Sequence, residues 1–296
     1  MAQLLVGADP VPWPGGFVAS AASRARPGDD PSPPGGLRST AQFRWPVYAP
    51  RMEAVGPCGE EVVPSFGDQQ TNKLWDHGPE RPVITVATQV ECSTFTQLPE
   101  AEWEAAVLDQ HNRQASAYVA YLAWNKDAQV TDAKGNKTAN LFADAFVLNQ
   151  QGGLYPDVLS RSVIALRIAG QTMTGGLNTD LGMLHIPAGL GEAVSDAGIV
   201  NDLTPGALPT VGPNAIPLIE DHGYSIQQFG EPTPETVAIV LAPTHSVRKS
   251  APNVAFPEGG VKDWRQNDAA VMVSQQFVWD WNGTPIGINV EVSDPV

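Results

Sequence analysis

The sequence is short of cysteine, of positive charge and of long apolar runs, and each shortage excludes a class of protein. Its two cysteines, Cys58 and Cys92, cannot form a disulfide scaffold, so a reducing compartment is the simpler expectation. Lys and Arg number 17 against 32 Asp and Glu, and the net charge of −15 excludes a protein whose main role is to grip nucleic-acid phosphates. No apolar run of about 18 residues occurs, so we expect no transmembrane helix. Residues 1–20 lack a charged start and are interrupted by prolines, so we expect no signal peptide.

Residues that could carry catalysis or bind a metal occur only in incomplete patterns. None of the five histidines is paired at the spacing of a zinc-binding helix. Residues 189–191 begin a dinucleotide-binding fingerprint, but Val194 stands where its third glycine is needed. Residues 223–225 resemble half of a nucleophile elbow, but Gln227 replaces the closing glycine. We therefore predict no catalytic, cofactor-binding or metal-binding residues, and we expect that the chain is not an enzyme.

Glycine and proline are abundant, and they concentrate near the N-terminus. The chain has 28 glycines and 27 prolines. Residues 1–50 contain nine of the prolines and six of the glycines, a composition that cannot build a core of its own. If this segment is ordered, something outside it holds it in place. Two alternatives have equal weight: an arm that lies on neighbouring copies of the chain, or a segment that packs on its own body.

Hydrophobic periodicity predicts a mixture of helices and strands. Residues 84–92 alternate between apolar and polar and predict a strand. Residues 97–124 give the strongest helix signal, with Pro99 in the first turn and acidic residues near the positive end of the helix dipole. Such a helix is about 40 Å long, which suits a structural spine. The other expected elements are short strands within 51–82, a polar hairpin at 126–140 that turns at 134–136, a helix at 157–170, a buried strand at 184–186, a helix ending near 198, and a buried strand at 236–241.

The C-terminal region predicts a β-hairpin. Residues 271–279 and 286–292 both alternate in the manner of strands, and Asn282-Gly283 between them is a strong two-residue turn signal. We expect the two strands to pair with each other.

Three segments together resemble the major capsid proteins of tailed phages, particularly those of actinobacterial phages. Residues 90–95, Val-Glu-Cys-Ser-Thr-Phe, lead into the acidic start of the long helix, and residues 181–188, Leu-Gly-Met-Leu-His-Ile-Pro-Ala, form a strand that enters a helix through His and Pro. At the C-terminus, the strand 236–241 precedes the basic step 245–249, and residues 266–268 open the last strands. The resemblance covers residues 83–296 in pattern and 1–82 in general character.

The resemblance implies an α+β fold, the tailed-phage major capsid fold known from the Hong Kong phage. Such subunits have an N-terminal arm, an extended loop, a peripheral domain built on a long spine helix, and an axial domain around the symmetry axes. On this sequence the expected divisions are the arm at 1–50, the extended loop at 51–92, the peripheral domain at 93–159 with its spine helix at 97–124, the axial domain at 160–245, and the return strands of the peripheral domain at 246–296.

The same resemblance implies a structural function: self-assembly, as hexamers and pentamers, into the icosahedral head shell that encloses phage double-stranded DNA. The expected partners are other copies of the chain, a portal, separate scaffolding or decoration proteins, and the packaged DNA by proximity alone, with no membrane and no cofactor. The expected location is the virion, after assembly in the cytoplasm of a bacterial host. The alternatives are an encapsulin-like nanocompartment shell, a minor or decoration head protein, and an uncharacterised hydrolase.

Contacts between subunits are expected to involve the N-terminal arm and the extended loop. Arm arginines would meet acidic partners, and large apolar side chains would add contact area. Lys73 is the only lysine of the extended loop and so the only candidate for a crosslink of the kind that some relatives form. The predicted contact residues are Trp13, Phe17, Arg24, Arg26, Arg38, Arg44, Lys73 and Trp75.

Overall fold

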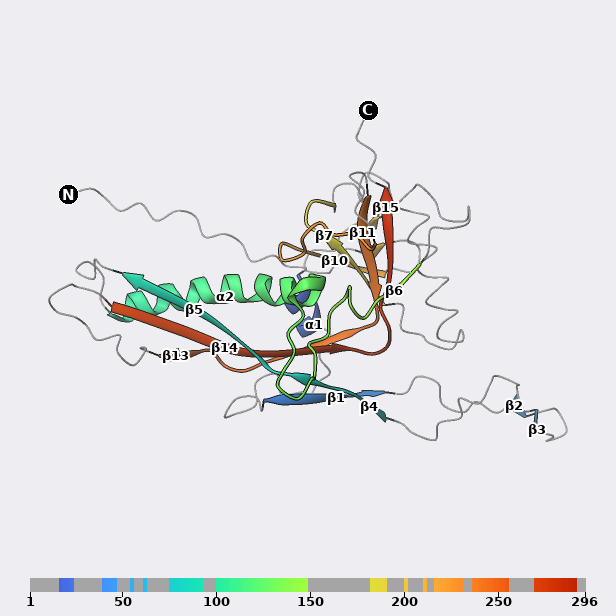
Figure 1. Cartoon of the computed structure of the whole chain (residues 1–296), viewed down its shortest axis with the longest axis horizontal. Coiled ribbons are helices and arrows are strands. Elements are labelled where there is room, and N and C mark those ends of the chain that lie inside the picture. The colour runs from blue at the N-terminus through green and yellow to red at the C-terminus, as the bar shows by residue number, and fades with distance from the viewer. Residues whose placement is uncertain are drawn as a thin grey trace, which may run out of the picture.

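Two β-sheets and one long helix make up most of the part of the chain that the structure describes. Figure 1 shows an elongated layer, in which the helix lies along one sheet, and a second sheet that stands across one end of this layer. The structure is a computed structural model, and it describes residues 16–23, 39–46, 54–55, 61–62, 75–92, 100–148, 182–190, 200–201, 210–211, 216–230, 236–255 and 269–291. None of the described helices is both long and apolar enough to span a membrane.

The elongated layer consists of helix α2 (Glu100–Trp124) and a sheet centred on β14 (Ala269–Trp281). On one edge β14 pairs with β5 (Ile84–Cys92) along the whole length of β5, and on the other edge it pairs with β12 (His245–Lys249) and β13 (Asn253–Ala255). The predicted strand at 84–92 and the predicted helix ending at residue 124 are confirmed. The helix is amphipathic, because its buried residues recur three or four positions apart and face the sheet. They include Val107, His111, Ala115, Val119, Leu122 and Ala123, and Ala120 and Trp124 near the end of the helix are buried as well.

The second sheet has seven strands, and its centre is formed by two of the predicted buried strands. β7 (Met183–Pro187) pairs antiparallel with β11 (Thr236–Ala242), and both are almost completely buried, as their continuous apolar sequences predict. The strand order is β6 (Phe146–Val147), β15 (Ile286–Glu291), β11, β7, β10 (Ile216–Asp221), β9 (Thr210–Val211), β8 (Val200–Asn201). The predicted helices at 157–170 and ending near 198 lie outside the described residues, apart from residue 190.

The predicted C-terminal hairpin is wrong. β14 and β15 do not pair: β14 belongs to the sheet under α2, and β15 pairs with β11 and β6 in the second sheet. The residues between them, 282–285, are a corner, in which Gly283 has φ +124° and the Asn282 N–H donates to the Thr244 carbonyl. An Asn-Gly step indicates a change of direction, and alternation indicates a strand with two different faces, but neither pattern specifies which strand is the partner.

Two adjacent crossings join the sheets. The chain passes from β11 to β12 through residues 243–244, and from β14 to β15 through residues 282–285, and the Asn282–Thr244 hydrogen bond links the two crossings. As a consequence, the second sheet takes its strands from three separated parts of the sequence. β6 and β15 lie in this sheet, whereas the expected divisions placed both in the peripheral domain.

The end of α2 and the two sheets meet in one aromatic core. Trp124 is fully buried, stacks on Tyr224 at 4.5 Å and meets the edge of Phe142 at 4.9 Å. Its indole N–H donates to the Ser225 carbonyl at 2.7 Å. Trp279 on β14 is also buried and donates to the Ala139 carbonyl at 2.8 Å. Both indole N–H groups are therefore satisfied, which burial of a tryptophan requires.

A short helix from the N-terminal segment packs into this core. Helix α1 (Phe17–Ser23) contacts α2, β10 and β12, and the side chain of Phe17 is 0% exposed. Phe17 was expected at a contact between subunits, but its own chain covers it completely, because its ring fills a buried site between β7, β12 and Tyr224. For residues 16–23, packing on the body of the same chain is the alternative that holds.

Gly182, at the start of β7, lies where a side chain has no room. Its φ is +72°, and a Cβ there would lie 2.6 Å from the Ala242 carbonyl oxygen on β11. Gly135, at the turn of the predicted polar hairpin, has a similar φ of +88° but no atom within 4 Å of such a Cβ. We expect Gly135→Ala to lower the free energy of unfolding by about 1–2 kcal/mol, the cost of the left-handed backbone. Gly182→Ala should cost at least about 1 kcal/mol more, since β7 and β11 must move apart.

Urea denaturation of the full chain measures both losses. Equal losses for the two variants would contradict the close approach of β7 and β11.

Candidate functional site

A two-stranded hairpin lies outside both sheets and leads away from the body. β1 (Thr40–Pro46) pairs antiparallel with β4 (Trp75–Pro82), from Thr40↔Pro82 at the base to Pro46↔Trp75 at the far end, with an irregularity between Gln42 and Arg44. Figure 1 shows the hairpin along the lower edge of the body, with β2 (Ala54–Val55) and β3 (Glu61–Val62) farther out. The expected boundary between arm and extended loop, at residue 50, falls between these paired strands.

The structure brings two of the predicted contact residues to one end of this hairpin. Arg44 pairs with His77, and Trp75 pairs with Pro46, two positions farther along the ladder. Phe17 lies instead in the core of the body. The remaining predicted contact residues, Trp13, Arg24, Arg26, Arg38 and Lys73, lie outside the described residues.

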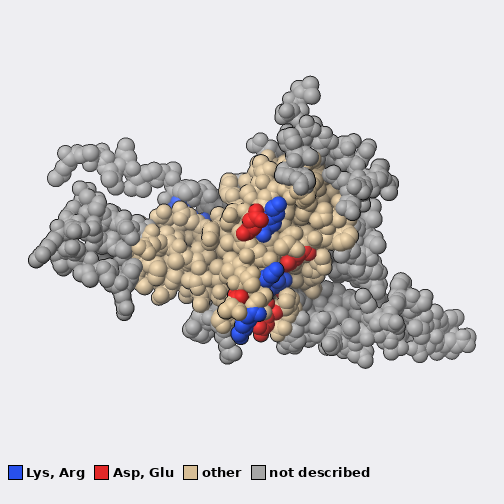
Figure 2. Space-filling model, viewed as in Figure 1, with Lys and Arg blue, Asp and Glu red and all other residues tan. Residues whose placement is uncertain are grey.

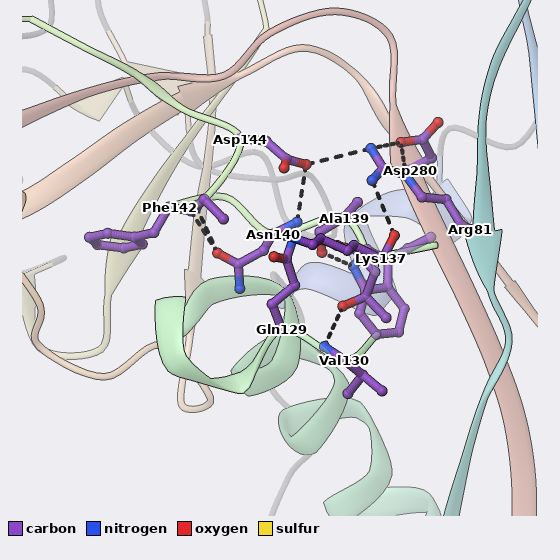
Figure 3. A network of polar contacts seen from close by, with 12 residues as sticks. Arg81, Gln129, Val130, Lys137, Ala139, Asn140, Phe142, Asp144 and Asp280 are labelled. Atoms are coloured by element: carbon purple, nitrogen blue, oxygen red, sulfur yellow. Dashed lines mark hydrogen bonds and ion pairs between the residues drawn. The ribbon is translucent and has the colours of Figure 1, made fainter. Parts of the chain in front are cut away.

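The base of the hairpin is fixed to the body by Arg81 on β4. Its guanidinium donates to the Asp280 carboxylate on β14 through Nε at 3.0 Å and through Nη2 at 2.9 Å. The same group reaches Asp144 at 3.5 Å and the Lys137 carbonyl at 3.2 Å, as Figure 3 shows. The Asp280 side chain is 1% exposed, so its charge depends on Arg81 for compensation within this network.

The loop after α2 completes the network and supplies the partners of the helix end. The Asn140 side chain donates to the carbonyls of Leu122 and Asn125 at 3.1 and 2.7 Å, and its Oδ1 accepts the N–H groups of Phe142 and Ala143. The Asp144 carboxylate accepts the Asn140 N–H at 3.2 Å. Burial raises the pKa of Asp144, and the neighbouring Arg81 acts against that rise. The hairpin base, the end of α2 and β14 are therefore one connected polar unit.

The side of α2 that borders β5 carries exposed aromatic residues. Tyr118 is 50% exposed, and its ring lies 6.1 Å from that of Tyr121 in a stacked arrangement. Both tyrosines border an open groove of about 750 Å³ between β5, α2 and the turn at 222–225. Tyrosine combines a large apolar ring with a polar hydroxyl, and it is enriched where one protein contacts another.

Charged groups are sparse on the face that Figure 2 shows. Its coloured side chains form small groups of both signs with uncharged surface between them. Among the residues that the structure describes, no three His, Cys, Asp or Glu side chains gather closely enough to hold a metal ion. The described surface thus presents an open groove, exposed tyrosines and an anchored hairpin.

Several solved structures are similar to this chain. A chain of Microbacterium phage Oxtober96 superposes with a TM-score of 0.54 at 10% identity, covering 99% of this chain and 96% of that one. A chain of Mycobacterium phage Ogopogo gives 0.49 at 12% identity, covering 99% and 97%. The holo-SrpI encapsulin complex of Synechococcus elongatus gives 0.45 at 12% identity, covering 84% and 85%. No protein-family model and no curated protein sequence matches this chain.

The Oxtober96 structure confirms the predicted fold class. Nearly the whole of both chains aligns, so the α+β major capsid fold of tailed phages, which the sequence resembled, is the fold of this protein.

The polar anchor, formed by Arg81, Asp280 and the loop around Asn140, was not predicted from the sequence. Arg81 and Asp280 are 199 residues apart, and neither belongs to a motif that marks it. Asn140 lies within the predicted polar hairpin, but its polarity there indicates exposure, whereas the structure buries it completely.

Removal of the Arg81 side chain should destabilise the fold strongly. Arg81→Met removes the guanidinium that pairs with the buried Asp280 carboxylate, and we expect a loss of about 3–5 kcal/mol in the free energy of unfolding. Arg113→Met is the matched control, since Arg113 pairs with the exposed Asp109 at 2.6 Å one turn away on α2; it should cost at most about 1 kcal/mol.

Chemical denaturation of the full chain compares these losses. The double variant Arg81→Met/Asp280→Leu should recover part of the stability, because the buried Asp280 charge is removed together with its cation, while Asp144 still loses its contact with Arg81. A loss for Arg81→Met no larger than that for Arg113→Met would contradict the role of the anchor.

Proposed function

We propose that this protein is the major capsid protein of a tailed bacteriophage, the repeating subunit of the icosahedral head shell around double-stranded DNA. The observation that carries the proposal is the capsid fold, which extends over nearly the whole chain. The hairpin supports it, because the anchor found among the described residues, Arg81, lies near its base, and the other end extends from the body toward a position where another subunit can contact it. The role is structural, and it needs no catalytic residue and no cofactor.

The subunit divides into the expected parts with revised boundaries. The arm ends before residue 40, and the extended loop is the segment between and including β1 and β4, since these strands form one ladder. The peripheral domain contains α2 and the sheet of β5, β12, β13 and β14. The axial domain contains the seven-stranded sheet, including β15. In this arrangement the axial domains surround the axes of the hexamers and pentamers.

The groove beside Tyr118 and Tyr121 is the docking surface for the β1–β4 hairpin of a neighbouring subunit. The groove is open along β5 and α2 among the described residues. Shell assemblies accumulate large interfaces, commonly more than about 2,000 Å² for an obligate contact. An extended hairpin adds contact area without enlarging the core of the subunit, and the exposed tyrosines would supply the apolar centre of the contact.

The acidic composition suits the interior of a DNA-filled shell. A net charge of −15 repels the phosphate backbone, so that packaged DNA stays mobile and is not bound by the wall. Assembly takes place in the cytoplasm of the bacterial host, with a portal at one vertex and a separate scaffolding or decoration protein as further partners.

Electron microscopy of the full chain expressed alone tests the assembly function. Closed shells, tubes or rings of capsomers are the expected result, and a stable monomer would overturn the proposal. Particles purified from infected cells distinguish the contents of the shell: double-stranded DNA supports a phage head, whereas an enclosed enzyme in place of DNA would identify a nanocompartment.

Substitution of the groove tyrosines should prevent assembly without unfolding the subunit. In the variant Tyr118→Ser/Tyr121→Ser two exposed rings are lost, so the stability of the isolated subunit should change by less than about 1 kcal/mol. Assembly should fall by at least tenfold, measured as the fraction of chain in particles after sedimentation. Val130→Ser removes another exposed apolar side chain away from the groove and should assemble normally. Normal assembly of the double variant would exclude this groove as the docking surface.

A further inference from the structure

Two buried histidines hold helix α1 against the body. The Nε2 of His245 on β12 donates to the Phe17 carbonyl at 2.8 Å and lies 3.3 Å from the Ser20 hydroxyl. The Phe17 ring stacks on the His245 ring, with centroids 4.5 Å apart and an interplanar angle of 7°. At the other side of Phe17, His185 on β7 shares a hydrogen bond of 2.8 Å with the Tyr224 hydroxyl.

The two imidazoles lie close together in a buried site. Their ring centroids are 5.5 Å apart, and the residues are 0% and 2% exposed. Two positive charges at that distance, away from solvent, repel each other and lose their hydration. Protonated His185 would need an acceptor on both ring nitrogens, yet no hydrogen-bond partner for its Nε2 occurs among the described residues. The docked position of α1 therefore requires neutral imidazoles.

We propose that His185 and His245 form an acid-sensitive latch, which keeps α1 docked while both imidazoles are neutral and releases it when they become protonated. The latch is a device of the single subunit, so it holds or fails independently of the shell function proposed above. What it controls is whether residues 16–23 remain on their own body.

The surroundings of the pair contain little charge that could compensate a proton. The residues paired with the two histidines in the sheets, Ile219, Val240 and Trp281, are apolar. Helix α1 contributes no charged side chain, and the last turn of α2 contributes no basic one. The remaining titratable groups of the site lie at the end of β10 and directly after it. They are Asp221, His222 and Tyr224.

These three groups do not reverse the effect. Burial and the nearby Asp221 raise the pKa of Tyr224 well above its usual value, so its hydroxyl stays neutral. His222 is exposed. Burial also raises the pKa of Asp221, whose Oδ2 accepts the Phe17 N–H at 2.8 Å. A raised carboxyl pKa favours the docked state at low pH, so Asp221 opposes release and must be controlled for.

The direction of the histidine effect follows from linkage. Burial, reinforced by the proximity of His245, lowers the pKa of His185 well below 6.5 in the docked state, while in the undocked state we expect it near its ordinary value. The stabilisation of docking is therefore complete above about pH 6.5 and is lost as the pH falls below that value. At pH 5.5, one pH unit below 6.5, the titration of a single histidine lowers the equilibrium constant for docking of α1 by about tenfold.

Release of α1 need not unfold the body. The helix has seven residues, and its buried side chains are Phe17, Val18, Ser20 and Ala21. The sheets keep their own cores, which include Val271 and Val273 under α2 and Ile239 and Ile288 in the second sheet. Elements with few buried contacts open at lower free energy than the whole domain.

Hydrogen exchange of the full chain, followed by mass spectrometry from pH 8.0 to 5.0 and corrected for the intrinsic exchange rate, tests the latch. We expect the protection of peptides within 16–23 to fall at least tenfold between pH 7.5 and 5.5, while peptides of β11 keep theirs. Constant protection of α1, or a simultaneous loss of protection in β11, would overturn the proposal.

Variants assign the effect to the pair. His245→Gln keeps an N–H donor for the Phe17 carbonyl but cannot titrate, and His185→Gln removes the second charge; each should reduce the pH dependence, and the double variant should abolish it. Phe17→Ala should lower protection at every pH without changing the slope, which keeps docking and titration separable. In the variant Asp221→Asn, the peptides of α1 should still lose their hydrogen-exchange protection below pH 6.5.

The matched control is His111→Gln. His111 is also buried, with its pKa lowered by burial, but its hydrogen-bond partner is Thr88 on β5, at 3.0 Å, and not a residue of α1. This variant should keep the full pH dependence of the α1 peptides. A pH dependence of α1 that survives in the His185→Gln/His245→Gln variant, or that disappears in His111→Gln, would show that the latch lies elsewhere.

Discussion

The ion pair between Arg81 and Asp280 is the constraint on which the arrangement of this subunit depends. Asp280 is buried in the longest strand, and a buried carboxylate is tolerated only where a cation and hydrogen-bond donors compensate it. Arg81 supplies that cation from the base of the projecting hairpin, and its guanidinium also reaches the loop after α2. One side chain thereby fixes the position of the hairpin relative to the helix and the sheet. The rest of the hairpin extends from this point.

A second constraint is the junction between the two sheets. Two chain crossings, at 243–244 and 282–285, run next to each other and are joined by a backbone hydrogen bond. The indole of Trp124 fills the space beside them and stacks on Tyr224, whose hydroxyl bonds His185. Helix α1 closes the same core from the N-terminal side. The orientation of one sheet relative to the other is therefore set by packing and by directed hydrogen bonds together, and it does not depend on a flexible connection.

These constraints agree with what a shell subunit must do. A subunit with a rigid junction presents its docking surfaces in a fixed geometry, and only such subunits can add up to a closed particle. The groove beside α2 and the hairpin consist of different residues, so under the proposed function each subunit can give a contact and receive one. The histidine pair adds a feature of another kind, because it makes the position of α1 depend on pH while the sheets retain their own cores.

The sequence by itself determined the secondary structure wherever the apolar pattern was long. It predicted the helix that ends at Trp124, the alternating strand at 84–92 and the buried strands at 184–186 and 236–241, since burial of one face or of both leaves a periodic signal. The resemblance of several such segments in order also indicated the capsid fold.

Only the tertiary structure decided which segments pair with or contact one another. Alternation is satisfied by any sheet, so nothing local showed that 286–291 joins β11 and not β14. Composition suggested that residues 16–23 could not pack alone, but not that a histidine pair more than 160 residues away would receive them. The pairing of Arg81 with Asp280 could likewise not be predicted from the sequence. The two residues are 199 positions apart, and their charges form an anchor only when folding removes the water around them.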